Sequence, residues 1–321
     1  MDSLTQEQLK ELVFVTAEHL RIKYPSIIEK DYYVTQVIHA LSGIENEYFR
    51  LIFAGGTCLA KAHKIVKRMS EDVDFKIQLK NTSEIFSKSR LLKEVKEFRA
   101  YIKSKLTLPG LIADEHVVRN EGKYSRIDLH YPSVFPANTG LRPHILLEFT
   151  LSDVRLDVAN LSIRTLIEDH LTDTIIFEPC STQCVSINET AIEKWVGLTR
   201  RIIAIEREYH HDDKALIRHA YDLNAIKDAD KINDDFFVLA KEIVNNDAKQ
   251  FKNQHPEYSI NPGDEIKRSL EVLKNSPRWK DRYQEFIETM VYDSPLTLEY
   301  EHAIASIEHM SVAIIDALNI E

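Results

Sequence analysis

Two aspartates one residue apart, Asp72 and Asp74, carry the strongest chemical signal in the chain. They stand at the start of a stretch, residues 73–79, in which apolar residues alternate as in a β-strand, so both carboxylates point to the same face. Carboxylates held side by side repel each other unless a cation lies between them. Mg²⁺ suits such a pair, because it binds one or two carboxylates together with the oxygens of a bound triphosphate. The spacing therefore indicates a metal site that acts on a phosphorylated ligand.

A second signal is Gly55-Gly56-Thr57, two adjacent glycines in a chain that has only 8. They follow a short apolar run, residues 51–54, that we interpret as a buried strand, and they precede a helix expected at residues 59–66. Such a turn can present backbone N–H groups and a helix N-terminus to an anion, and Thr57 adds a hydroxyl donor. A tight turn without a ligand explains the glycines equally well. Together with the aspartates, the turn favours a phosphate site.

Glu148 is a third candidate carboxylate, within the apolar run Leu146-Leu147-Glu148-Phe149. A charge in so apolar a strand needs a partner, because an unpaired buried charge is costly. We interpret Glu148 as a metal ligand beside the aspartate pair. A salt bridge to a core arginine is the structural alternative, and Asp128 is the competing choice for the third carboxylate.

The elements that must position these residues follow from the hydrophobic periodicity. Residues 1–186 mix helical and strand-like patterns, whereas strand patterns nearly vanish after Asn188. We therefore expect an α+β fold, with a domain of residues 1–186 built on a small mixed sheet flanked by helices and a helical C-terminal domain of residues 187–321. Further strands are expected at residues 117–119, 124–130 and 144–149, the first two forming a hairpin. Helices are expected at residues 4–22, 31–41, 189–208, 214–227, 234–245, 264–275, 279–292 and 296–318.

Two helix starts are expected at polar residues. Asp31 is a good N-cap for the helix of residues 31–41. Asn81-Thr82-Ser83-Glu84 is a capping signature ahead of a long amphipathic helix. The apolar face of that helix contains Leu92, Val95, Phe98 and Ile102, and its other side contains Lys88, Lys96, Arg99 and Lys103.

The composition, 44% hydrophobic and 29% charged, is that of a globular protein. The lack of a long apolar run or signal-peptide pattern, and three cysteines without zinc-site spacing, favour a reduced cytoplasmic protein with no membrane partner. Because the net charge is −10, a nucleic acid would have to meet a local basic patch. Simple solvation also explains a lysine-rich helix face. Candidates for such a patch are Lys61, Lys64, Lys67 and Arg68, together with the basic side of the long helix.

The order of strand, Gly-Gly-Thr, helix, Arg68-x-Ser70-x-Asp72-Val73-Asp74-Phe75 and a later carboxylate strand resembles the polymerase-β-like nucleotidyltransferase core. More narrowly, it resembles the AbiEii/AbiGii family of nucleotidyltransferase toxins from bacterial toxin–antitoxin systems. Three further blocks resemble that family over residues 27–225: Ile28 to Tyr32 with its Glu-Lys-Asp stretch, Glu193-Lys194 with Arg200 or Arg201, and Arg218 to Leu223. The chain departs from the family at His219, where an acidic residue is usual.

The resemblance implies a two-metal nucleotidyl transfer from an NTP. Asp72, Asp74 and Glu148 would bind Mg²⁺, and Gly55, Gly56 and Thr57 would hold the phosphates. Arg68 and Ser70 would orient the phosphates or brace the Asp-Val-Asp strand. From the helical domain, Lys194 would supply a charge to the triphosphate and Asp222 would act in the catalytic cleft. The resemblance also implies a cognate antitoxin partner and an RNA acceptor, with a tRNA 3′ end as the expected target.

Two other functions fit the same residues. The chemistry can be kept while the acceptor is a protein hydroxyl or a small molecule, which suits the negative net charge better. Alternatively, the chain is a catalytically idle binding module of the same fold. Against the idle module stands the aspartate pair, because folding alone does not call for two like charges side by side. For Glu29, Lys30 and Asp31 we favour a structural role as a cluster of ion pairs.

Overall fold

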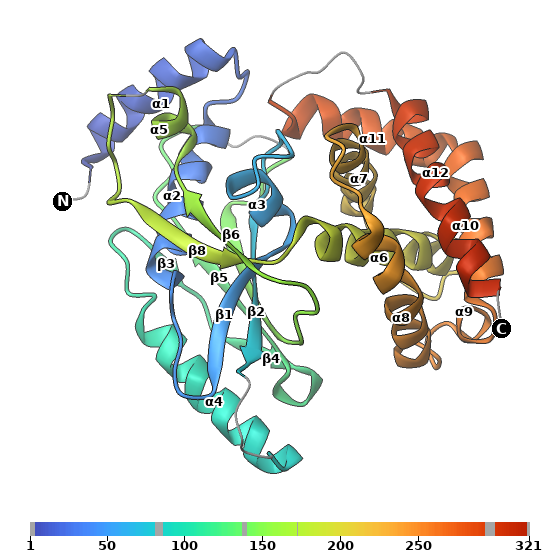
Figure 1. The fold of residues 1–321 in the computed structure, drawn as a ribbon. Coiled ribbons are helices and arrows are strands. Elements are labelled where there is room, and N and C mark those ends of the chain that lie inside the picture. The colour runs from blue at the N-terminus through green and yellow to red at the C-terminus, as the bar shows by residue number, and fades with distance from the viewer. Residues whose placement is uncertain (1–3, 81–85, 137–139, 172, 293–298, 320–321) are drawn as a thin grey trace. The chain divides into compact units, whose positions relative to one another are not determined.

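The computed structural model describes residues 4–80, 86–136, 140–171, 173–292 and 299–319. The chain forms two compact units, residues 1–186 and 187–321, which run from blue to yellow-green and from yellow-green to red in Figure 1. Each unit is described by itself below. Among the described residues, every helix is too short or too polar to cross a membrane.

The first unit is built on a mixed sheet, as expected, although the sheet is larger than the small one expected. Among the described residues, its strands follow the order β3-β5-β6-β2-β1-β8-β7, and β4 pairs with β5 outside this path. The pairs β1–β8 and β2–β6 are parallel and the remaining pairs are antiparallel. The strands are β1 Phe49–Ala54, β2 Asp72–Leu79, β3 Ile112–Ala113, β4 Val117–Arg119, β5 Tyr124–His130, β6 His144–Leu151, β7 Ala159–Ile163 and β8 Cys180–Cys184.

One face of the sheet is an aromatic core. The register aligns Phe53 of β1, Phe75 of β2 and Phe149 of β6 in one row, with ring centroids 5.3 and 6.1 Å apart. On the same face Phe49 packs against Phe98, with ring centroids 5.6 Å apart, so the helix α4, Lys88–Ser104, lies along this side of the sheet (Figure 1). Because side chains alternate along a strand, residues of even number on β2 point to the opposite face.

Helices of the first unit complete the core, and α1, α2 and α5 pack together. Their bounds are α1 Gln6–Leu20, α2 Ser26–Leu41, α3 Gly55–Lys61, α4 Lys88–Ser104 and α5 Leu166–His170, with a 3₁₀ turn at Asn120–Gly122 in the predicted β4–β5 hairpin.

One expected helix start is wrong, and another falls on residues that the structure does not describe. Asp31 is not an N-cap, because α2 already begins at Ser26 after Pro25. Asp31 lies buried inside α2, where its carboxylate accepts hydrogen bonds from Lys61 Nζ at 2.6 Å and from the Leu166 N–H at 2.7 Å. The expected capping signature at residues 81–84 lies outside the described residues. In the structure α4 begins at Lys88, and Ser87 accepts from the Arg90 N–H at 3.3 Å.

The second unit is helical in its described part, as expected. Trp195 and Trp279 are fully buried and anchor its core, and the Trp195 indole donates to Ser311 Oγ at 2.9 Å. The helices are α6 Ile187–Glu206, α7 Arg218–Asp228, α8 Asp234–Gln250, α9 Pro256–Ile260, α10 Pro262–Asn275, α11 Pro277–Met290 and α12 Tyr300–Asn319, with a 3₁₀ turn at Lys214–Ile217.

Candidate active site

The register of three neighbouring strands places the candidate carboxylates on the face opposite the aromatic core. Asp74 of β2 stands beside Ala54 of β1 and beside Glu148 of β6. Asp72 lies two residues earlier and therefore shares this face with Asp74. Adjacent strands are about 4.8 Å apart, so Asp74 and Glu148 are direct neighbours.

Gly55 makes room for Asp74 at the turn between β1 and α3. Its φ is +75°, in the left-handed region that residues with a Cβ rarely adopt. A Cβ at this position would overlap the Asp74 carboxylate oxygen Oδ2 and would lie 2.9 Å from Cγ and 3.0 Å from Cβ of the same residue. Gly55 is therefore required both by the backbone and by the position of the Asp74 carboxylate.

Gly56 makes room for two other predicted residues. A Cβ on Gly56 would overlap the Arg68 guanidinium and lie 3.1 Å from Ser70 Oγ. Both side chains are buried, and Arg68 Nη1 donates to the Met69 carbonyl at 3.0 Å. Of the two roles left open for Arg68 and Ser70, these contacts match the bracing of the segment that enters β2.

Thr57 has a structural contact in this site. Its side chain is buried, and its hydroxyl donates to the backbone carbonyl of Asp72. The hydroxyl thus ties α3 to the first residue of β2. Any contact of Thr57 with a phosphate would use its backbone N–H, because the hydroxyl is engaged.

Arg142, which no sequence pattern singled out, forms an ion pair with Asp72. It stands in the loop before β6, and its guanidinium also lies near Glu71, with Nε 3.7 Å from Oε1. Burial lowers the pKa of Arg142, but the neighbouring Asp72 and Glu71 carboxylates outweigh it and hold the pKa above its ordinary value. Arg142 is therefore a fixed positive charge at the edge of the carboxylate face.

Glu148 accepts a hydrogen bond from the Tyr124 hydroxyl of β5. Burial and this carboxylate raise the pKa of Tyr124, so the phenol stays protonated and can donate. The competing carboxylate, Asp128, lies one strand further from β2, opposite Leu146. Asp128 pairs with Arg126 Nε at 3.0 Å. Of the two, Glu148 is the one in direct register with Asp74.

The oxygen atoms of the three candidate carboxylates suit a hard divalent cation, although the carboxylates do not lie close enough together to surround one. Among the described residues no three His, Cys, Asp or Glu side chains are grouped closely enough to hold a metal ion. Asp72, Asp74 and Glu148 nevertheless offer only oxygen ligands on one face, and Gly55 keeps the space beside Asp74 free of a side chain. Mg²⁺ needs only one or two protein carboxylates and takes its other ligands from water and phosphates.

The upstream Glu29-Lys30-Asp31 block has the structural role that we favoured for it. All three side chains are buried. Glu29 accepts from Ser133 Oγ at 2.5 Å and from the Val134 N–H at 2.8 Å. Asp31 binds Lys61, and Lys30 binds Glu71 at 2.8 Å.

Lys194 and Asp222, the predicted residues of the second unit, are brought together by that unit itself. Lys194 of α6 lies with its Nζ 2.9 Å from Asp222 Oδ2 of α7, and both side chains are buried. The Asp222 carboxylate therefore fixes the position of the Lys194 ammonium group.

The expected basic patch is wrong at three positions. Lys61 and Arg68 are buried, and Lys61 forms an ion pair with Asp31. Arg99 is buried as well and donates to the Gly122 carbonyl at 2.5 Å. Helical periodicity could not reveal these tertiary partners. Lys64 and Lys67 remain exposed, as do Lys88, Lys96 and Lys103 on α4.

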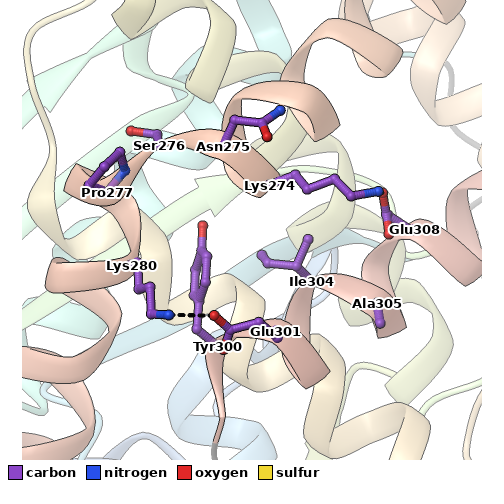
Figure 2. A pocket seen from close by; sticks show the side chains of 10 residues that line it. All are labelled: Lys274, Asn275, Ser276, Pro277, Lys280, Tyr300, Glu301, Ile304, Ala305 and Glu308. Atoms are coloured by element: carbon purple, nitrogen blue, oxygen red, sulfur yellow. Dashed lines mark hydrogen bonds and ion pairs between the residues drawn. The ribbon is translucent and has the colours of Figure 1, made fainter.

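A pocket of about 320 Å³ lies within the second unit, between α10, α11 and α12. Figure 2 shows its two lysines turned toward glutamates: Lys280 lies 2.5 Å from Glu301 and Lys274 lies 3.0 Å from Glu308. None of the predicted site residues lines this pocket.

The solved structures include similar folds at low sequence identity. MenT4, a nucleotidyltransferase toxin from Mycobacterium tuberculosis H37Rv, is 16% identical with a TM-score of 0.53, over 95% of this chain and 89% of that chain. An H. pylori protein assigned to the nucleotidyltransferases is 14% identical with a TM-score of 0.39, over 91% of this chain and 94% of that chain. A comparison with curated proteins gives no match.

The model of one protein family covers most of the chain. It describes the AbiEii nucleotidyl transferase toxins of type IV toxin–antitoxin systems and matches residues 43–307. This span includes the Gly-Gly-Thr turn, the aspartate pair, Glu148, Lys194 and Asp222. The chain belongs to the AbiEii family of nucleotidyltransferase toxins, and its fold is that of a nucleotidyltransferase toxin.

Proposed function

We propose that the first unit carries the catalytic centre of an Mg²⁺-dependent nucleotidyl transfer onto RNA, with a tRNA 3′ end as the acceptor. In this reaction an acceptor hydroxyl oxygen forms a bond to the α-phosphorus of an NTP. The bond from that phosphorus to the bridging oxygen breaks and pyrophosphate leaves. The hydroxyl proton passes to a base, for which Glu148 is our candidate.

The observation that carries the proposal is the setting of Asp74. Its carboxylate lies over a glycine at which a side chain would overlap it, and it stands in register with Glu148 on the adjacent parallel strand. Folding alone gains nothing from placing carboxylates on one face, because they repel each other. Binding of a cation and a phosphate explains the arrangement.

Each residue then has a defined task. Asp72, Asp74 and Glu148 would hold two Mg²⁺ ions, which would neutralise charge on the attacking and leaving oxygens. The backbone N–H groups of Gly55 and Gly56 would face a phosphate oxygen. Tyr124, donating to Glu148, orients that carboxylate.

For Lys194 and Asp222 we propose that the ion pair works as a unit. The buried Asp222 carboxylate orients the ammonium group of Lys194, 2.9 Å away. The ammonium supplies a point charge to the triphosphate of the substrate. Lys194 can bind Asp222 and a phosphate oxygen at the same time, because an ammonium group has three N–H donors.

An RNA acceptor is supported by the exposed lysines of α4. Lys96 and Lys103 are exposed, and Lys88 is exposed but pairs with Glu121 at 2.7 Å, in a chain whose net charge is −10. A local basic surface of this kind lets a globally acidic protein bind a phosphate backbone. Family membership further implies an NTP substrate and a cognate antitoxin.

The second candidate is the same transfer to a protein hydroxyl or a small molecule, which the net charge of −10 favours. One experiment separates the acceptors. The protein is incubated with Mg²⁺ and each α-labelled NTP, together with deproteinised cellular RNA, cellular protein or a small-molecule extract. Label on a discrete RNA supports the first proposal. Label only on protein or on small molecules rejects the RNA acceptor but retains the transfer chemistry.

A further inference from the structure

A fully buried ion pair lies directly behind the carboxylate face. Lys30 of α2 and Glu71, the residue before β2, have exposed side-chain fractions of 0% and 1%, and Lys30 Nζ lies 2.8 Å from Glu71 Oε2. Removing two charges from water costs free energy that their attraction often fails to recover, and apolar residues of similar volume are often as stable. Stability alone is therefore a weak reason for this pair.

The buried pair holds the backbone of one loop residue from both sides. The Arg142 N–H donates to Glu71 Oε2 at 2.7 Å, and Lys30 Nζ donates to the Arg142 carbonyl at 2.9 Å. Both backbone polar groups of Arg142 are thus fixed by charged partners, which form stronger hydrogen bonds than neutral ones. The backbone position from which the Arg142 side chain extends is therefore fixed.

From this fixed backbone the Arg142 side chain extends to the candidate site. It pairs with Asp72 while its side chain stays 38% exposed. A triphosphate that approaches Asp72, Asp74 and Glu148 would meet a face of like charge. An arginine at the edge of that face offers planar N–H donors that match phosphate oxygens and stays charged at every physiological pH.

We propose that Arg142 is a nucleotide-binding residue, whose guanidinium contacts the triphosphate of the NTP donor and is positioned for this by the buried Lys30–Glu71 pair. The inference rests on the proposed function and deepens it, because it names a binding residue and two positioning residues of the same site. Lys30 and Glu71 do not touch the substrate. They act through the backbone of Arg142.

The test measures equilibrium binding of a non-hydrolysable α,β-methylene NTP in the presence of Mg²⁺, by calorimetry. Arg142→Ala should weaken binding about 10- to 100-fold, as expected for the loss of a charged hydrogen bond. Its thermal midpoint should stay near that of the wild type, because the side chain is partly exposed. Arg142→Lys should fall between the two, since lysine keeps the charge but not the planar donors.

Arg126→Ala is the matched control. Arg126 lies opposite Glu148 on β5, is also 38% exposed and also pairs with an aspartate, Asp128. This control removes the same charge from the same face of the sheet, and it should change nucleotide affinity less than about threefold. Equal losses in both variants would mean that only the general positive charge matters, which would overturn the proposal.

The positioning role needs a variant that keeps the protein folded. Replacing the pair by apolar residues, Lys30→Met with Glu71→Leu, should leave the thermal midpoint close to that of the wild type. The double variant should lose nucleotide affinity about as much as Arg142→Ala, and adding Arg142→Ala to it should cost little more. Wild-type affinity in the folded double variant would overturn the positioning role.

The outcomes separate the inference from the proposed function. If the wild type binds the nucleotide analogue and Arg142→Ala binds it with the same affinity, the role of Arg142 is rejected and the proposed function stands. If the wild type binds none of the α,β-methylene analogues of the four NTPs in the presence of Mg²⁺, both proposals fail. A loss in Arg142→Ala that Arg126→Ala does not share supports the inference.

Discussion

Replacing Gly55 by alanine is expected to displace Asp74, the proposed catalytic carboxylate, while leaving the protein folded. The φ of Gly55 is +75°, and a Cβ would overlap the Asp74 carboxylate and lie 2.9 Å from its Cγ. Gly43 provides a matched control in the same unit. Its φ is +67°, and a Cβ there would have no heavy atom within 4 Å. The two variants therefore share the backbone strain, and only Gly55→Ala adds the overlap with Asp74.

The magnitudes follow from these two contributions. A residue with a Cβ in the left-handed region costs about 1–2 kcal/mol, and for a unit of this size each kcal/mol lowers the thermal midpoint by about 2–4 °C. Ordinary contacts between heavy atoms are about 3.5 Å long, so the Asp74 carboxylate has to move by on the order of 1 Å. Misplacing a catalytic group by about 1 Å can reduce the rate about 100-fold.

The assay is the rate of label transfer from an α-labelled NTP at saturating substrate, together with the thermal midpoint. Gly55→Ala should be slower by about 100-fold or more, whereas Gly43→Ala should keep its rate within about twofold despite a similar fall in midpoint. Wild-type activity in Gly55→Ala would refute the assignment of Asp74. Equal inactivity of both variants would show that stability, not the overlap, controls the rate.

Three further predictions concern single side chains. Glu148→Gln should reduce transfer by at least about 100-fold and Asp128→Asn by less than about threefold; the reverse order, measured in the same rate assay, would move the third carboxylate to Asp128. Lys30→Ala should destabilise the protein by about 3–5 kcal/mol in urea unfolding, because it leaves a buried carboxylate without its cation, and a loss below 1 kcal/mol would contradict this estimate. For Glu168, burial raises the pKa, but hydrogen bonds from the Thr165, Phe177 and Ile176 N–H groups outweigh it and hold the pKa below the ordinary 4.5. A lowered pKa in the folded state stabilises the protein above about pH 4.5 and ceases to do so as the pH falls through the folded-state pKa, so Glu168→Gln should be about 1.5–3 kcal/mol less stable than the wild type at pH 7. The difference should shrink in unfolding curves measured below pH 4.5, and a difference independent of pH would exclude this linkage.

Local patterns predicted the parts of the site that depend on neighbours in the sequence. The positions of Asp72 and Asp74 on one face follow from strand periodicity alone, and the glycine turn follows from its place between a strand and a helix. The structure adds why Gly55 is a glycine, because the overlap with Asp74 involves a residue 19 positions away. Such a contact leaves no periodic signal in either segment.

Contacts between distant segments account for what was missed. Arg142 is a lone arginine in a loop, and its importance appears only through Lys30 and Asp72, which lie far from it in the sequence. Periodicity also misjudged Arg99 and Lys61, since a charged side chain is expected on a solvated face unless a buried partner is known. Asp31 was misassigned for the same reason: its partners, Lys61 and the Leu166 N–H, come from other elements.

Family membership narrows the chemistry without identifying the acceptor. The family is that of nucleotidyltransferase toxins, and a fold supports a reaction class better than a substrate. The position of Asp74 over Gly55 and its register with Glu148 support the proposed role of these carboxylates in that reaction. The exposed lysines of α4 support the proposal of an RNA acceptor.

The central claim is that Asp74 belongs to the catalytic centre of an Mg²⁺-dependent transfer. The most direct measurement compares the wild type with Asp74→Asn, which has nearly the same size, for transfer from an α-labelled NTP to deproteinised cellular RNA, with Mg²⁺ and with excess EDTA. We expect label on a discrete RNA only for the wild type with Mg²⁺, and a thermal midpoint of Asp74→Asn that is unchanged or raised. Labelling by Asp74→Asn at the wild-type rate, or a marked fall in its midpoint, would contradict the catalytic role of this carboxylate.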